Sequence, residues 1–113
     1  MNKKFGQHLR QLRKKKDFSQ RDLAEQLKVN WTYISKLETG ALEPPSDALI
    51  HQIAMALEAD EDTLLNLAGK IPRGLKEAMK DNPLLVELAF ILSRQQLSDE
   101  TYSKLLKIAK GAL

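Results

Sequence analysis

The stretch from Ser19 to Gly40 constrains the fold most, because it predicts two short helices joined by a tight turn. Ser19 can cap the first helix, and Asp22 follows three residues later, as in a capping box. Asn30 can cap the second helix, and Gly40 suits the left-handed conformation that often ends one. Between these caps the apolar residues recur at helical spacing, at Leu23, Ala24, Leu27, Ile34 and Leu37. Such narrow apolar faces must be covered by each other and by neighbouring helices.

Periodicity predicts three further helices around this pair. The first spans residues 4–15, and a fourth follows a cap at Ser46, after an extended segment with two prolines. A fifth runs over residues 61–67. The residues expected to join the core from these helices and from the first connection are Phe5, Leu9, Leu12, Phe18, Leu49, Ile50, Ile53, Ala54 and Leu57. We therefore expect residues 1–69 to form one compact all-α domain.

Several spaced features of this segment agree with one known family. They are Gln20, Leu23-Ala24, Val29, Tyr33-Ile34-Ser35, Leu37-Glu38 and Gly40, followed by Pro44-Pro45. With them, the region from about Phe5 to Leu67 resembles the phage-repressor (Xre, Cro/repressor) class of helix-turn-helix DNA-binding proteins. In that class the second helix of the pair lies in the major groove of DNA. Lys28 stands where the family usually has glycine, and a left-handed lysine there would cost about 1 kcal/mol.

The resemblance implies a set of DNA-contacting side chains. Gln20 is expected to touch a phosphate and brace the second helix, although it could be a plain exposed first-turn residue. Asn30 would cap that helix and meet a phosphate. Thr32 and Lys36 lie one turn apart on one face, where a hydroxyl and an ammonium can hydrogen-bond to base edges. Asn30, Thr32 and Lys36 are the strongest candidates for contacts in the major groove.

Three neighbouring residues are expected to join the DNA-binding set, each with an alternative. Trp31 could pack on sugar-phosphate or on a thymine methyl, or simply lie on the domain surface. Tyr33 could reach a phosphate through its hydroxyl or stand as a half-buried wedge. Ser35 is small enough to permit close approach and could bond a base or a phosphate. None of these assignments defines an operator sequence, because DNA shape also contributes to recognition.

The resemblance also implies an ion pair between Arg13 and Glu38 that joins the first and third helices. Glu38 stands alone among apolar positions, which favours a buried pair over a loose surface one. An exposed pair would contribute less than about 1 kcal/mol. Removing one partner of a buried pair costs roughly 3–5 kcal/mol, because a charge remains buried without its counterion.

Charge is distributed unevenly along the chain although its net charge is only +3. Residues 1–36 carry ten Lys or Arg against three acids, and residues 37–69 carry seven acids and no Lys or Arg. A basic block over the first three helices is what a phosphate-facing surface needs. The run Lys14-Lys15-Lys16 taken alone is better explained as a solvated helix face.

The last 44 residues have a different character. Lys70 to Gly74 is expected to be a hinge or a tight corner, followed by a short helix with Leu75, Ala78 and Met79 on one side. Pro83 suits the first turn of the next helix, whose residues 84–92 are apolar on nearly every side. Ser98 can cap a last helix with an apolar stripe that extends to Leu113.

We expect residues 70–113 to form a helical oligomerisation region, with a hairpin that is covered by a second copy of the chain. The residues predicted for this dimer interface are Leu84, Leu85, Leu88, Ile91, Leu92, Leu105 and Leu106. The alternative is that residues 84–92 dock on the first domain as additional core. The dimer is favoured because the family usually binds DNA as dimers.

Catalytic and metal-binding chemistry find little support in the sequence. There is no cysteine, so neither a disulfide nor a thiolate zinc site is possible. His8 and His51 lack metal-ligand spacing, and no glycine-rich phosphate loop is present. No long uncharged apolar run or secretion leader is found. The sequence therefore predicts a protein without enzymatic activity, cofactor, metal or membrane contact, located in the cytoplasm.

Together these features predict a sequence-specific double-stranded DNA-binding transcriptional regulator. A homodimeric repressor on an inverted repeat is expected, with half-sites about 34 Å apart. Regulation would come from a protein partner of the C-terminal hairpin, since that region is too short for a sensory domain. The alternative is a protein-interaction module, such as the antitoxin of a toxin-antitoxin pair, with DNA binding secondary.

Overall fold

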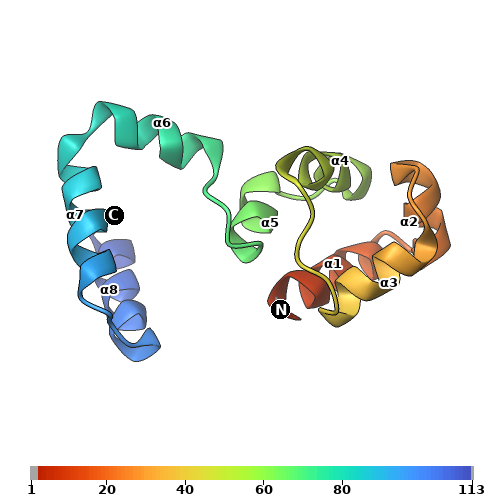
Figure 1. The fold of residues 1–113 in the computed structure, drawn as a ribbon, viewed down its shortest axis with the longest axis horizontal. Helices are drawn as coiled ribbons and strands as arrows, with labels where there is room; N and C mark the ends of the chain where they lie inside the picture. Colours follow the sequence, from red (N-terminus) through yellow and green to blue (C-terminus); the bar gives the residue numbers. More distant parts are fainter. Residues whose placement is uncertain (1–2, 113) are drawn as a thin grey trace. The chain divides into compact units, whose positions relative to one another are not determined.

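The computed structural model describes residues 3–112, and within that range it contains helices and no β-strand, as Figure 1 shows. The helices are α1 (Lys3–Lys15), α2 (Gln20–Leu27), α3 (Trp31–Thr39), α4 (Asp47–Leu57), α5 (Glu61–Leu67), α6 (Arg73–Asp81), α7 (Pro83–Arg94) and α8 (Asp99–Gly111). Contacts divide them into two compact units, the first ending at Arg73 and the second beginning at Gly74. The all-α prediction is confirmed. Leu113, in the predicted last stripe, lies outside the described residues.

The predicted helix caps are present and explain where the helices begin. The Asp22 backbone N–H donates to the Ser19 hydroxyl at 3.0 Å, and the Ser19 N–H donates to the Asp22 carboxylate at 2.9 Å. This capping box lowers the pKa of Asp22, chiefly through the Ser19 backbone hydrogen bond. The Asn30 carbonyl oxygen caps α3, and the Ser46 hydroxyl caps α4. Local capping chemistry therefore sets the start of each of these helices.

The turn between α2 and α3 keeps the left-handed geometry of the family even without glycine. Lys28 has φ 58° and ψ 44°, and its backbone N–H donates to carbonyls in the last turn of α2. Glu58 ends α4 in the same conformation, with φ 51°. Since a side chain in this region costs about 1 kcal/mol, the packing of α2 against α3 must hold Lys28 in place.

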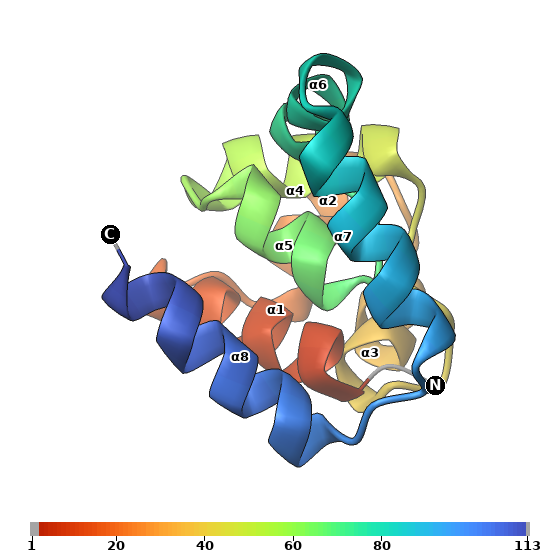
Figure 2. The same ribbon diagram turned by 90° about the vertical axis from the view of Figure 1, so that its left-hand side faces the viewer.

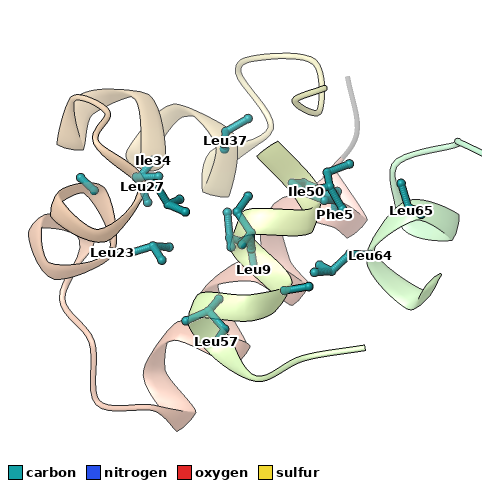
Figure 3. Packing of buried hydrophobic residues seen from close by; sticks show 13 residues of the cluster. Phe5, Leu9, Leu23, Leu27, Ile34, Leu37, Ile50, Leu57, Leu64 and Leu65 are labelled. Atoms are coloured by element: carbon teal, nitrogen blue, oxygen red, sulfur yellow. The ribbon is translucent and has the colours of Figure 1, made fainter. Parts of the chain in front are cut away.

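The core of the first unit lies between α1 and the other four helices. α1 packs against α3 and α5, while α2 packs against α3 and α4. Figure 3 shows their apolar side chains converging, and the fully buried ones are Phe5, Leu9, Leu23, Ile34, Leu37, Ile50, Ile53 and Leu64. Leu12, Phe18 and Leu49, also predicted for the core, are only partly buried at its edge.

A close contact between α1 and α3 depends on Gly6. A Cβ atom added to Gly6 would lie 2.5 Å from the Glu38 carbonyl oxygen and closer still to the Leu37 carbonyl oxygen. Real Cβ atoms do not approach backbone atoms so closely. The absence of a side chain at Gly6 therefore sets the distance between α1 and the C-terminal half of α3.

The hinge or tight corner predicted for residues 70–74 is shorter than expected, because α6 already begins at Arg73. The other predicted boundaries are confirmed, since Pro83 opens α7 and Ser98 caps α8. α7 and α8 run in opposite directions with a gap between their ribbons (Figure 2). The Tyr102 hydroxyl donates to the Leu92 carbonyl at 3.3 Å and links them near the turn.

No described residue of α6, α7 or α8 is buried. Leu84, Leu88 and Leu106 are all more than half exposed, at 74%, 55% and 57%. The other residues predicted for the dimer interface, Leu85, Ile91, Leu92 and Leu105, are at least partly exposed. The second unit therefore carries a large apolar surface that its own helices do not cover. Across residues 3–112, no helix has the length and apolar character needed to span a membrane.

Candidate nucleic-acid interface

The outward face of α3 is formed by side chains that the core does not use. Ile34 and Leu37 point inward and are buried, whereas Thr32 and Lys36 are exposed. These two lie four residues apart, so they project from the same side of the helix. Lys36 makes no side-chain hydrogen bond or ion pair within residues 3–112, so its ammonium donors are free for a ligand. The structure thus places the two predicted base-reading residues together.

Asn30 and Thr32 are linked at the start of α3. The Asn30 Oδ1 atom accepts both the Thr32 backbone N–H and the Thr32 hydroxyl, each at 3.0 Å. Its amide N–H groups therefore remain available to an external acceptor such as a phosphate oxygen. The Thr32 hydroxyl, whose proton is used here, keeps its lone pairs and its methyl group for a base edge.

Behind this face, a buried polar network joins α1, α2 and α3. Glu38 accepts from Arg13 Nε at 2.6 Å and from Arg13 Nη2 at 3.0 Å, and both residues are 8% exposed. Arg13 also donates to the Phe18 carbonyl at 2.8 Å. Its hydrogen bond to Glu38 raises the pKa of Arg13. The ion pair that the resemblance implied is therefore buried and bidentate, not a loose surface contact.

Gln20 connects this network to the surface. Its side-chain Nε2 donates to Glu38 Oε1 at 3.2 Å, which braces the start of α2 against α3. The second N–H on Nε2 remains free to donate. Gln20 also lines a shallow hollow, together with Lys3, Gln7, Arg10, Glu38 and Thr39. The three α1 residues in this hollow, at i, i+4 and i+7 on the helix, are absent from the predicted site.

The remaining three predicted residues, Trp31, Tyr33 and Ser35, lie in different surroundings. Trp31 is 39% exposed and lies on the flank of α3 toward α2, where its ring contacts Arg21. Tyr33 packs partly against the core, which favours the half-buried wedge, and this burial raises the pKa of its hydroxyl group. Ser35 is also half-buried. Arg21 was not predicted; a cation and an aromatic residue in the first turns of consecutive helices are the signal that could have suggested it.

Other charged groups have structural partners. Lys16 of the basic block pairs with Glu58 of the acidic block, and Lys70, which follows the acidic block, pairs with Asp47. The exposed His51 ring contacts the Glu61 carboxylate. Among the residues described, no group of three or more His, Cys, Asp or Glu side chains could hold a metal ion.

Two short helices at a capped, left-handed turn, with the second exposing a polar face, define a helix-turn-helix protein. Residues 4–67 match the family model described as a helix-turn-helix domain. The chain belongs to this family, and its helix-turn-helix is of the phage-repressor (Xre, Cro/repressor) type.

Individual relatives lead to the same family. The chain is 31% identical over 87 residues to RghRB of Bacillus subtilis (strain 168), an uncharacterized HTH-type transcriptional regulator, covering 74% of this chain and 63% of RghRB. It is 34% identical over 62 residues to the HTH-type transcriptional regulator SinR of Bacillus licheniformis, covering 55% of this chain and 56% of SinR. The chain thus spans less than two thirds of the length of these two relatives.

The similarity extends to solved structures. The SinR chain in the crystal structure of SinR, a master regulator for biofilm formation, in complex with DNA is 33% identical to this chain in sequence, and the two structures superpose with a TM-score of 0.51. That match covers 54% of this chain and 97% of the SinR chain. A SinR protein/SinI protein complex covers 96% of both chains with a TM-score of 0.52, and at 22% identity it shows the fold alone.

Proposed function

We propose that the chain is a sequence-specific, double-stranded DNA-binding repressor that acts in the cytoplasm as a homodimer. Residues 1–69 bind DNA and residues 70–113 form the oligomerisation region. α3 enters the major groove, and the dimer binds an inverted repeat with half-sites about 34 Å apart. The observation that carries the proposal is the exposed polar face of α3, where Asn30, Thr32 and Lys36 present unused hydrogen-bonding groups. The similarity to SinR, which was solved in complex with DNA, supports it.

Selection from a random duplex pool at near-physiological salt tests the sequence specificity. We expect enrichment of an inverted repeat. Recovery of duplexes that bind no better than random DNA, with affinity that vanishes as salt rises, would leave only counterion-driven binding. That result would contradict the proposal of a sequence-specific regulator.

Substitutions on α3 and α2 should separate base reading from phosphate contact. Thr32→Ala and Lys36→Ala are expected to lower discrimination between the selected duplex and random DNA, by about 1–3 kcal/mol for a lost base contact. Gln20→Ala should weaken binding to both duplexes evenly, as a lost phosphate contact does. Titrations of both duplexes with each variant measure the difference. Equal losses on both duplexes for Lys36→Ala would contradict its base-reading role.

Besides the proposed DNA interface of α3, the exposed apolar surface of α7 and α8 favours a protein–protein interface. Several large apolar side chains of α7 and α8 are exposed, and exposed apolar patches mark interaction sites. A second copy of the chain is the proposed occupant, because an inverted repeat requires two recognition helices. The second candidate function is an antitoxin-like module in which a different protein covers this surface. A protein with the same fold, SinR, was solved in a complex with another protein, SinI, which supports this candidate.

Leu88→Asp tests the dimer. Leu88 is exposed on α7, so an aspartate at this position would be buried only if the chain dimerised through this surface. Because burying that carboxylate is unfavourable, we expect Leu88→Asp to give monomers or insoluble protein. Ser93→Asp, an exposed polar position on the same helix, is the matched control and should remain dimeric. Sedimentation equilibrium measures both. A Leu88→Asp variant that stays dimeric would exclude this surface as the dimer interface, and a wild-type chain soluble only with another protein would favour the antitoxin-like function.

A further inference from the structure

We propose that Arg21 is a DNA-contacting residue that binds a backbone phosphate, and that Trp31 is the positioning residue that holds its guanidinium group. This inference rests on the proposed DNA-binding function and deepens it. It adds a residue to the interface that the family pattern did not supply. It also gives Trp31 a defined role as the platform beneath that residue.

The first observation is the stacking of the two side chains. The Arg21 Cζ atom lies over the Trp31 ring, 4.8 Å from its centroid. Arg21 is in the first turn of α2, and Trp31 is the first residue of α3. A guanidinium on an indole face is attracted by the ring electrons and loses rotational freedom. Trp31 therefore fixes the plane of the guanidinium group.

The second observation is that the stacking leaves the donors of Arg21 unused. Within residues 3–112 Arg21 has neither an ion pair nor a hydrogen bond from its guanidinium, and it is exposed. Arg13 is different, because its donors are consumed by Glu38 and by the Phe18 carbonyl. A fixed, planar group with free N–H donors at its edge is suited to bind an anion in a bidentate manner. Arg21 is thus oriented and available.

The third observation identifies the ligand as a phosphate rather than a base. Arg21 and Trp31 line a shallow hollow at the junction of α2 and α3, together with Ala24, Glu25, Val29 and Asn30. Asn30, whose amide N–H groups make no hydrogen bond within residues 3–112, also lines this hollow, so both side chains can donate to one phosphate group. Arg21 belongs to α2 and lies next to Gln20, the predicted phosphate contact. Thr32 and Lys36, the residues proposed to read bases, are not among the residues that line this hollow.

The test uses the full chain, the selected duplex and a scrambled duplex, titrated over a series of salt concentrations. Arg21→Ala should lower the affinity for both duplexes by a similar factor, roughly 10- to 100-fold for a charge-assisted hydrogen bond. It should also make the slope of log affinity against log salt less steep by about 0.9, the value for one phosphate contact. Thermal melting monitors the fold of each variant.

Lys15→Ala is the matched control, because it removes an exposed positive charge at the end of α1 that belongs neither to the stack nor to the hollow beside it. We expect it to change affinity and salt slope far less than Arg21→Ala. Equal effects of the two variants would show that only total charge matters and would overturn the phosphate contact. A loss confined to the selected duplex would also overturn it, since that result indicates base reading.

The role of Trp31 is tested in a double-mutant cycle. Arg21→Ala should cost less affinity in a Trp31→Ala background than in the wild type, because the guanidinium is no longer held. Trp31→Phe, which keeps an aromatic face, should retain most of the wild-type affinity and salt slope. Independent, additive losses would overturn the positioning role.

These outcomes separate the inference from the function on which it rests. If the wild type binds the selected duplex and Arg21→Ala matches it, only the Arg21 assignment fails. If the wild type binds no duplex beyond counterion-driven affinity, the proposed function and the Arg21 assignment fail together.

Discussion

Gly6→Ala is expected to destabilise the first unit by about 3 kcal/mol or more, the upper range for overpacking in a protein core. The new Cβ would meet the carbonyl oxygens of Leu37 and Glu38, and neither atom can move without displacing the backbone of α3. Alanine ordinarily stabilises a helix relative to glycine by about 1 kcal/mol, so the sign of the effect is itself informative. Urea unfolding followed by circular dichroism measures the change.

Gly74→Ala provides the control for this experiment. Gly74 is also helical, in α6, but a Cβ there meets no atom within 4 Å. The transition of the first unit should be unchanged by this substitution. A Gly6→Ala protein as stable as the wild type would show that α1 and α3 do not approach as closely as described. We also expect Gly6→Ala to weaken DNA binding, because it displaces the helix that carries Lys36.

Glu38→Gln is expected to cost roughly 3–5 kcal/mol of stability, the range for breaking a buried ion pair by removing one partner. Glu38 accepts from Arg13 twice and from Gln20 once, and an uncharged amide cannot satisfy that set of donors. The guanidinium of Arg13 would remain buried without a counterion. The free energy of unfolding from urea titration measures the loss.

Two comparisons make the test of Glu38 specific. Glu58→Gln removes the partner of Lys16 at an exposed position, where solvent screens the interaction, and it should change stability little. The double variant Arg13→Met/Glu38→Leu should lose less than Glu38→Gln alone, because no buried charge remains. A double variant as unstable as the single one would contradict the assignment of the loss to an unpaired charge.

The elements were predictable because their boundaries are determined by local chemistry. Ser19, Asn30, Ser46 and Ser98 each cap a helix through bonds that span two or three residues, so the sequence alone specifies them. The start of α6 at Arg73 was missed. No side-chain cap is found at its start, so no local signal separates the hinge from the helix.

Contacts between distant residues were harder to predict. Periodicity identified the inward side chains, but the approach of Gly6 to Glu38 joins residues 32 positions apart and has no local signature. The pairing of Arg13 with Glu38 came from the family resemblance, not from spacing. Neither the periodicity nor the family resemblance predicted the stack of Arg21 on Trp31, because it depends on the angle between α2 and α3. Sequence thus identifies the α3 face, whereas its supporting contacts require the three-dimensional arrangement.

The left-handed lysine between α2 and α3 has a consequence for the level of the protein in a cell. Lys28 carries conformational strain of about 1 kcal/mol, at a position outside the proposed DNA-contacting set. Changes of 1–2 kcal/mol in stability can alter the abundance of a protein several-fold, because chaperones and proteases act on the unfolded fraction. Variation at this one turn can therefore adjust how much of the protein is present without changing any of the proposed DNA-contacting residues.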